Sequence, residues 1–145
     1  MQCDGFVSEM RTRAEADWPL VSVVEDDPAA AALAAELCDG LGARALLFAS
    51  ATPFLSAFTD AAPRAVVLDW RLEREVGAAA FMAVRHRFPA LPVVCWTASQ
   101  PDRLPAMVHH DPMTRVVGKA AGPAAFEAAL AWALGAAEAL TAPVS

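Results

Sequence analysis

The chain has 145 residues, a formal net charge of −6 and no cluster of Lys or Arg. This length fits one domain with a core of its own, and the charge argues against a nucleic-acid-binding surface. Charges and prolines interrupt every apolar stretch before it reaches membrane-spanning length, so the sequence predicts no membrane segment. We expect residues 1–18 to form a flexible leader, residues 19–141 one domain and residues 142–145 a short tail.

The N-terminal residues and the cysteines bear on the cellular compartment. Residues 1–18 have acids among their basic residues and no apolar centre, which is not the pattern of a signal peptide. Cys3, Cys38 and Cys95 form an odd, scattered set without a CxxC pair or a metal-ligand spacing. These features predict reduced core thiols in a cytoplasmic protein.

Predicted strands and predicted helices alternate along the chain. Five apolar runs predict buried strands, namely residues 20–24, 43–49, 65–69, 92–97 and 115–119. Capping signals and helical spacing predict five helices, namely residues 29–39, a short helix from Thr52, a third from Gly77, a weak helix over 100–114 and a long helix over 123–140. This alternation predicts an α/β fold, a three-layer α/β/α sandwich around a five-stranded parallel sheet.

Two of these helices carry more detailed expectations. Asp27 followed by Pro28 predicts an N-cap with proline at the first helical position. In the third helix the apolar residues share one face, so we expect Arg85, His86 and Arg87 to face mostly water.

Four predicted strands end in residues that can carry chemistry: Glu25 and Asp26, Asp69, Thr97 and Lys119. The carboxyl ends of parallel strands meet at one edge of the sheet, where α/β folds bind ligands. Three carboxylates placed together repel one another unless a hard cation such as Mg²⁺ lies among them. A hydroxyl and an ammonium opposite that cation can hold phosphoryl oxygens. Lys119 is the single lysine beside ten arginines, which favours a specific role for it over a surface position.

In this order and spacing the residues resemble the receiver domain of two-component response regulators, over about residues 20 to 140. The matching segments are Val23-Val24-Glu25-Asp26-Asp27-Pro28, Leu68-Asp69, Gly77 in the following loop, Thr97-Ala98 and Lys119. The resemblance implies a flavodoxin-like strand order, 2-1-3-4-5, and a phosphoacceptor domain in a phosphorelay. It also implies a signalling domain rather than an enzyme.

The resemblance further implies a role for each site residue. Asp69 would accept a phosphoryl group from a sensor histidine kinase or a histidine phosphotransfer protein. Asp26, Asp69 and the backbone carbonyl of Arg71 would hold Mg²⁺, and Glu25 would act mostly through a bound water. Phosphoryl binding and switching would fall to Thr97, Ala98 and Lys119.

Three positions depart from the family. Val116 stands where the family often has an aromatic residue that swings inward on switching, and Glu73 stands where the loop after the phosphoacceptor commonly has proline. Ala120 replaces the usual proline after the lysine, so we expect a trans peptide bond before it. The phosphorylation chemistry is expected to remain, while the usual switching route is not.

Arg71 lies two residues beyond Asp69 and allows two interpretations. Its side chain could contact the phosphoryl group or shield it from water, and either would lengthen the life of the phosphorylated form. Alternatively, it faces solvent and pairs with Glu73 or Glu75.

Two other features could carry contacts. The last helix is apolar around most of its circumference, which suggests a docking or homodimer face that includes Phe126, Leu130, Trp132 or Leu134. Residues 109–111 (His-His-Asp) could suggest a metal site, but adjacent helical residues point in different directions and no third ligand is evident.

The first functional hypothesis is a single-domain response regulator that signals to a downstream protein by contact. A second is a pseudo-receiver, an interaction module that no longer depends on phosphorylation; the missing aromatic at Val116 favours it, and the complete acid, hydroxyl and lysine set argues against it. A third is a phosphohydrolase of the haloacid dehalogenase type, but Arg71 occupies the place of its second aspartate.

Overall fold

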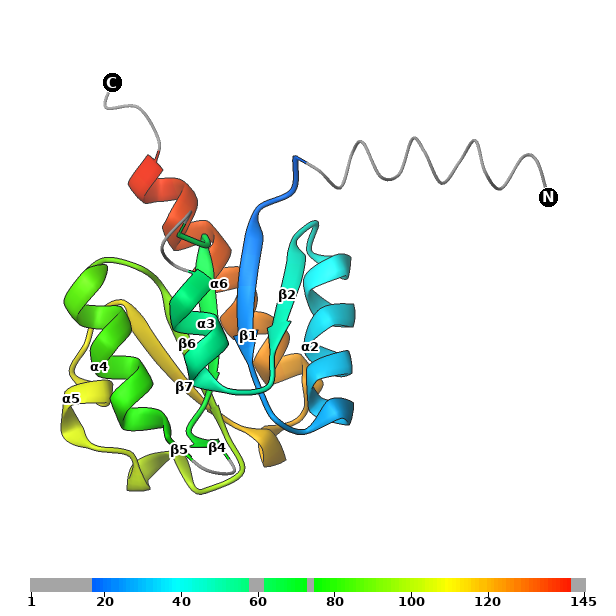
Figure 1. Cartoon of the computed structure of the whole chain (residues 1–145). Coiled ribbons are helices and arrows are strands. Elements are labelled where there is room, and N and C mark those ends of the chain that lie inside the picture. The colour runs from blue at the N-terminus through cyan, green and yellow to red at the C-terminus, as the bar shows by residue number, and fades with distance from the viewer. Residues whose placement is uncertain (1–16, 58–61, 73–74, 142–145) are drawn as a thin grey trace.

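The centre of the fold is a parallel sheet of five strands (Figure 1). The computed structural model describes residues 17–57, 62–72 and 75–141. The strands are β1 (Leu20–Val24), β2 (Arg44–Phe48), β3 (Ala65–Asp69), β6 (Val93–Thr97) and β7 (Thr114–Gly118). Their order is β2-β1-β3-β6-β7, and every neighbouring pair runs parallel. The predicted order 2-1-3-4-5 is therefore confirmed.

The central strands are buried on both faces, as their unbroken apolar sequences predict. All five residues of β3 and of β6 are buried, whereas the outer strands β2 and β7 are mostly accessible. Successive side chains point to opposite faces of the sheet. Val66 and Leu68 therefore belong to one apolar cluster, and Val67 belongs to another on the opposite face.

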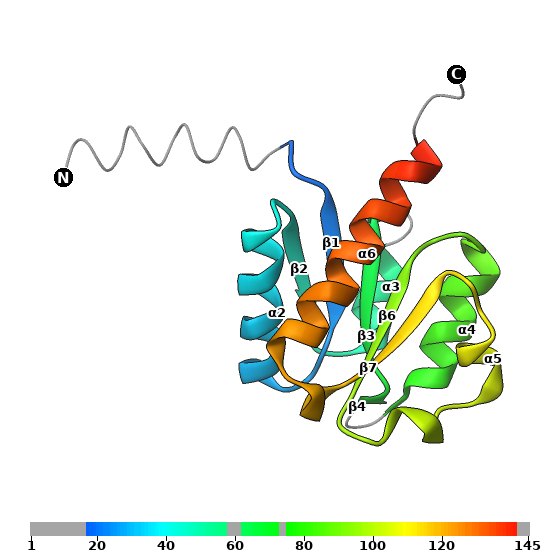
Figure 2. The same ribbon diagram turned by 180° about the vertical axis from the view of Figure 1, so that it is seen from behind.

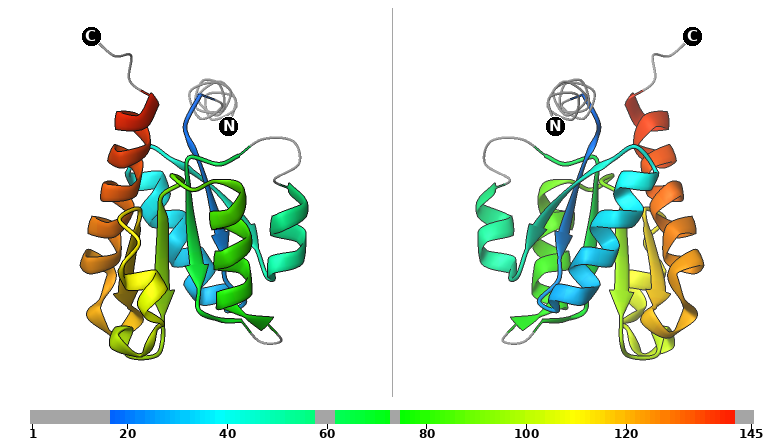
Figure 3. Two further views of the ribbon diagram at one scale, coloured as in Figure 1. Left: turned by 90° about the vertical axis from the view of Figure 1, so that its left-hand side faces the viewer. Right: turned by 90° about the vertical axis from the view of Figure 1, so that its right-hand side faces the viewer.

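Helices cover both faces of the sheet (Figures 2 and 3). They are α2 (Pro28–Gly40), α3 (Ala51–Ala57), α4 (Gly77–Arg87), α5 (Ala106–His109) and α6 (Pro123–Thr141). Buried residues of α2 and α6, among them Cys38 and Phe126, pack on one face. The other face is covered by Phe54 of α3, Phe81 of α4 and Val108 of α5. The predicted three-layer sandwich is confirmed.

Helix α2 begins where the sequence predicts. The carboxylate of Asp27 accepts a hydrogen bond from the backbone N–H of Ala30 at 3.3 Å, and Pro28 occupies the first helical position. Proline has no N–H to leave unsatisfied there, and its fixed φ suits a helix. Just beyond the helix, Gly42 has a φ of +75°, a conformation that glycine adopts without steric cost.

The predicted helix over residues 100–114 is wrong. The segment contains only a 3₁₀ turn, η1 (Pro101–Arg103), and the one-turn helix α5. Pro105 separates them in an extended conformation, with φ −60° and ψ 152°, since a proline inside a helix would remove a hydrogen bond and clash with the preceding turn. The connection between β6 and β7 therefore contains no long crossover helix.

Two smaller differences concern strand ends. β7 covers Thr114–Gly118, one residue earlier than predicted, and Lys119 begins a short 3₁₀ turn, η2 (Lys119–Ala121). After Asp69 the chain also forms β4 (Arg71–Leu72) and β5 (Glu75–Val76), an antiparallel pair of two residues each that was not predicted. Such short pairs leave no periodic signal in a sequence.

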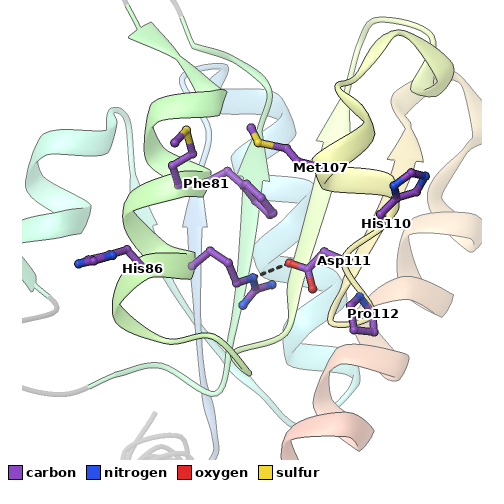
Figure 4. A pocket seen from close by; sticks show the side chains of 8 residues that line it. Phe81, His86, Met107, His110, Asp111 and Pro112 are labelled. Atoms are coloured by element: carbon purple, nitrogen blue, oxygen red, sulfur yellow. Dashed lines mark hydrogen bonds and ion pairs between the residues drawn. The ribbon is translucent and has the colours of Figure 1, made fainter.

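The prediction that Arg85 faces water is also wrong. Its guanidinium forms an ion pair with Asp111 (Figure 4). It donates to the carbonyl oxygens of Phe88 and Leu91, at 3.0 and 2.7 Å. It also donates to Oγ1 of Thr114 at 2.9 Å. Arg85 therefore ties α4 to the start of β7, whereas His86 and Arg87 are exposed as expected.

Candidate functional site

The residues that were predicted from strand ends lie at one edge of the sheet. Glu25 and Asp26 follow β1, Asp69 is the last residue of β3, and Thr97 is the last residue of β6. Lys119 follows β7 directly. Because all of these strands run parallel, their carboxyl ends meet and the five side chains belong to one site.

Three carboxylates form the acidic part of this site. One oxygen each of Glu25, Asp26 and Asp69 lies within 4.8 Å of the others. Glu25 is 4% exposed and Asp69 is 3% exposed, whereas Asp26 is partly exposed. Burial weakens the screening of these charges by water, so the cluster attracts a cation strongly.

Lys119 supplies a positive charge from the opposite side. Its ammonium lies 2.8 Å from Oε2 of Glu25 and 3.7 Å from Oδ2 of Asp69, and the lysine side chain is 23% exposed. One ammonium offsets one of the three carboxylate charges. The remaining two negative charges match a divalent cation.

The donor set fits such a cation. Oε1 of Glu25 accepts a hydrogen bond from the backbone N–H of Asp27 at 3.1 Å. Oε2 is buried and, among the described residues, has the ion pair with Lys119 but no hydrogen bond of good geometry. A buried carboxylate oxygen with unused acceptor capacity, beside two further carboxylates, suits a hard ion with oxygen ligands such as Mg²⁺.

Thr97 provides a fixed hydroxyl at the same edge. Its side chain is fully buried, and Oγ1 accepts a hydrogen bond from the backbone N–H of Ser99 at 3.0 Å. Asp69 lies opposite Trp96 in the strand register, so Thr97 stands one residue further along the neighbouring strand. Ala98, the small residue that follows, is exposed.

Gly77 fixes the loop that follows Asp69. Its backbone N–H donates to the carbonyl oxygen of Trp70 at 3.0 Å, where β5 meets α4. A Cβ atom on Gly77 would lie 2.7 Å from that oxygen, closer than side-chain atoms approach. The sequence placed Gly77 in this loop, and the structure supplies the steric reason for glycine.

The departures from the family pattern have mixed outcomes. No cis peptide bond occurs in residues 17–57, 62–72 and 75–141, so the bond before Ala120 is trans as predicted. Val116 is half-buried and packs against the cluster that includes Phe81. Arg71 lies in β4, but its side chain, like the whole of Glu73, is outside the described part of the chain, and the expectation for it remains a prediction.

The predicted docking face on the last helix needs correction. Phe126 and Leu130 are fully buried in the cluster between α6 and the sheet, so neither is available to a partner. Trp132 and Leu134 are partly buried and pack at the margin of the same cluster. The helix is apolar around most of its circumference because many small alanines accompany one buried stripe of residues. Composition alone could not tell the alanines on the surface from the residues of the buried stripe.

The remaining candidates have structural roles. Nε2 of His109 lies 2.8 Å from the carbonyl oxygen of Pro101, and Asp111 is paired with Arg85, so these residues hold the segment before β7. Cys38 and Cys95 are buried free thiols, which confirms the prediction of reduced core cysteines for these two. Cys3 lies outside the described residues.

A groove of about 560 Å³ lies between α4 and α5, apart from the acidic cluster (Figure 4). It is lined by Phe81, Met82, Arg85, His86, Met107, His110, Asp111 and Pro112. Met82 and Met107 are 58% and 42% exposed. None of the residues predicted for the site is among the described residues that line it.

Sequence reasoning missed one contact at the site. It assigned Trp96 to core packing, and the indole is indeed buried, but the ammonium of Lys119 also lies 5.0 Å from the centre of its ring. Its position directly before Thr97 was the available signal.

Comparison with known proteins gives a consistent result. The family model described as response regulator receiver domain matches residues 21–131. A search of curated protein sequences gives no significant match. None of the helices within the described residues is both long enough and apolar enough to cross a membrane.

Solved structures show the same fold at low sequence identity. The signal receiver domain of a putative Luxo repressor protein from Vibrio parahaemolyticus superposes with a TM-score of 0.73 at 15% identity, covering 85% of this chain and 95% of that one. The receiver domain of sensor histidine kinase PA1611 from Pseudomonas aeruginosa, with magnesium coordinated in its active site cleft, has a TM-score of 0.68 at 22% identity and covers 81% and 98%. The receiver domain of Nitrogen Regulatory Protein C gives 0.68 at 24% identity and covers 81% and 94%.

Proposed function

Because the chain belongs to the family of response regulator receiver domains, we propose that Asp69 is its phosphoacceptor in a two-component phosphorelay. The donor is a phosphohistidine of a sensor histidine kinase or of a histidine phosphotransfer protein. Residues 19–141 form the receiver domain, which acts in the cytoplasm and signals to a downstream protein by contact. The observation that carries this proposal is the ion-paired lysine and carboxylate cluster around a buried aspartate.

The proposed transfer is a displacement at phosphorus. A carboxylate oxygen of Asp69 attacks, a P–O bond forms, and the P–N bond to the donor histidine breaks. The electron pair of that bond goes to the ring nitrogen of the donor histidine, whose other ring nitrogen carries a proton, so the ring leaves as neutral imidazole. Little covalent chemistry is required of other side chains, so positioning and charge neutralisation carry the catalysis.

The acidic cluster would hold Mg²⁺ for this step. Asp26, Asp69 and the backbone carbonyl of Arg71 are the proposed ligands, with Glu25 acting mostly through a bound water. The ion supplies positive charge next to the incoming phosphoryl oxygens. Support comes from the unused acceptor capacity of Oε2 of Glu25 and from the closeness of the three carboxylates.

Lys119 and Thr97 would hold the transferred group. The ammonium already lies between Glu25 and Asp69, so a phosphoryl group on Asp69 comes within its reach. The hydroxyl of Thr97 accepts from Ser99 and keeps its own proton to donate to a phosphoryl oxygen, with the small Ala98 beside it. We assign no swinging aromatic to the switch, because Val116 stands in its place.

The test is intact-mass spectrometry after incubation with MgCl₂ and acetyl phosphate. We expect one phosphoryl adduct that is lost on addition of EDTA and is absent in Asp69→Asn. The matched control is Asp102→Asn, which changes an exposed aspartate outside the cluster and should leave the adduct unchanged. A wild-type protein that stays folded and forms no adduct with any small donor would favour a phosphorylation-independent interaction module.

The same assay tests the proposed role of Arg71 in the lifetime of the adduct. After the donor is removed, Arg71→Ala should alter the rate at which the adduct disappears. Equal decay in variant and wild type would assign Arg71 to the solvent-facing alternative.

A further inference from the structure

The ammonium of Lys119 has a third neighbour besides the two carboxylates. It lies over the ring of Trp96, 5.0 Å from the ring centre, which is within the distance at which a cation is attracted to an aromatic face. The indole is 4% exposed, so little water competes on that side. Trp96 precedes Thr97 and sits opposite Asp69 in the register of β3 and β6.

The indole is itself held in place. The ring of Phe126 stacks on it with a centroid distance of 4.0 Å and an interplanar angle of 5°. Phe126 is fully buried and comes from α6, which covers this face of the sheet. Trp96 also pairs with Val117 in β7, two residues before Lys119. The ring therefore cannot turn without breaking the stack and disturbing a central strand.

We propose that Trp96 is a positioning residue whose ring face holds the Lys119 ammonium beside Asp69. The inference rests on the proposed function, because it concerns the lysine that would bind the phosphoryl group. A lysine has a flexible four-carbon stem and a strongly hydrated head, and this side chain is 23% exposed, so water competes for it.

An aromatic face suits this task better than a further carboxylate. Glu25, at 2.8 Å, draws the ammonium toward β1 and offsets its charge. The ring attracts the ammonium through its quadrupole, carries no net charge and takes up none of its N–H donors in a directed hydrogen bond. The charge and donors of Lys119 thus remain available to phosphoryl oxygens on Asp69.

The first measurement needs no variant. Lys119 is the only lysine in the chain, so protein labelled with [¹³Cε]lysine gives a single lysine signal by NMR. Protons over an aromatic face resonate upfield, so we expect the Hε signal upfield in the native protein and back at the unstructured position in urea. A native signal at the unstructured position would overturn the proposal.

Variants then connect the placement to phosphorylation. Trp96→Leu should lose the upfield shift and slow adduct formation by acetyl phosphate roughly three- to thirty-fold, the rate equivalent of a cation–π contact. Trp96→Phe keeps a ring and should restore most of both readouts. The control is Val94→Ala, a buried change on the same strand and the same face, which should leave the lysine signal and the rate unchanged.

These outcomes separate the inference from the proposed function. If the wild type forms no adduct, the proposed function fails, while the lysine signal still decides whether Trp96 holds Lys119. If the wild type is phosphorylated and folded Trp96→Leu matches it in rate, the positioning role is wrong. A rate that falls equally in Val94→Ala would also contradict it, because the loss would then follow from any core defect.

Discussion

At the scale of single residues, the candidate site depends on a close approach between two backbone segments next to Asp69. Gly77 lies against the backbone of Trp70, and this contact fixes where the chain turns back after Asp69. The Cα atom of Trp70 would lie only 2.8 Å from an added Cβ. Because that neighbour is backbone, it cannot move aside as a flexible side chain would.

Gly77→Ala should therefore lower the free energy of unfolding by roughly 1–3 kcal/mol, the usual cost of forcing extra atoms into a packed site. Urea denaturation followed by circular dichroism measures this change. The matched control is Gly135→Ala in α6, where an added Cβ meets no atom within 4 Å. That variant should be more stable by roughly 0.5–1 kcal/mol, because alanine loses less backbone entropy in a helix. A neutral Gly77→Ala would show that the loop relaxes freely.

At the scale of elements, one arginine connects α4 to the segment between β6 and β7, where the predicted helix is absent. The segment between β6 and β7 contains only two short turns, and its buried apolar residues Leu104 and Val108 belong to the same cluster as Phe81 of α4. Arg85 adds a polar connection from α4 to Asp111 and to Thr114, the first residue of β7. Asp111 in turn accepts a hydrogen bond from the backbone N–H of Met113 at 2.9 Å.

Arg85→Met should destabilise the protein by about 3 kcal/mol, since removing one partner leaves a largely buried carboxylate unpaired. Thermal and urea unfolding measure the loss. Arg87→Met, two residues along the same helix but exposed, should stay within about 0.5 kcal/mol of wild type. If both variants lose the same stability, the network around Asp111 contributes nothing specific.

At the scale of the whole molecule, the sheet separates two apolar clusters, and each cluster contains one buried thiol. Cys38 lies between α2 and the sheet, whereas Cys95 lies in β6 and faces α4 and α5. Burial raises the pKa of the Cys38 thiol to about 11 and that of the Cys95 thiol to about 12, from an ordinary value of 9.0. Both thiols therefore remain protonated in the native protein at neutral pH.

This burial predicts how stability depends on alkaline pH. Between pH 9 and about 11 the unfolded chain has lost the thiol protons that the native protein still holds, so the free energy of unfolding falls as pH rises. The slope is about 1.4 kcal/mol per pH unit for each thiol, and below pH 9 the contribution is fully present. Urea titrations at several pH values should show a shallower fall in Cys38→Ala and in Cys95→Ala. Equal slopes in all three proteins would exclude this linkage.

The amino-acid sequence alone was enough to predict the five strands of the main sheet, the parallel α/β class and the candidate residues at the edge of the sheet. Continuous apolar runs identify strands that are buried on both faces, and Asp27 with Pro28 marks a helix start through local chemistry alone. The polar residues at the ends of four of the five runs can also be read directly from the sequence. Parallel topology then brings Asp69, Thr97 and Lys119 to one edge without further information.

The folded structure was needed to tell which apolar residues of the last helix are buried and which charged residues are paired. Arg85 lies within a basic stretch, yet its guanidinium is held by Asp111 and Thr114, which are distant in sequence. Phe126 is buried, although periodicity does not distinguish it from most of the other apolar residues of its helix. The ring of Trp96 meets Lys119 because β6 pairs with β7 and Lys119 directly follows β7. These contacts join segments distant in sequence, and the energy of each depends on neighbours that local patterns do not record.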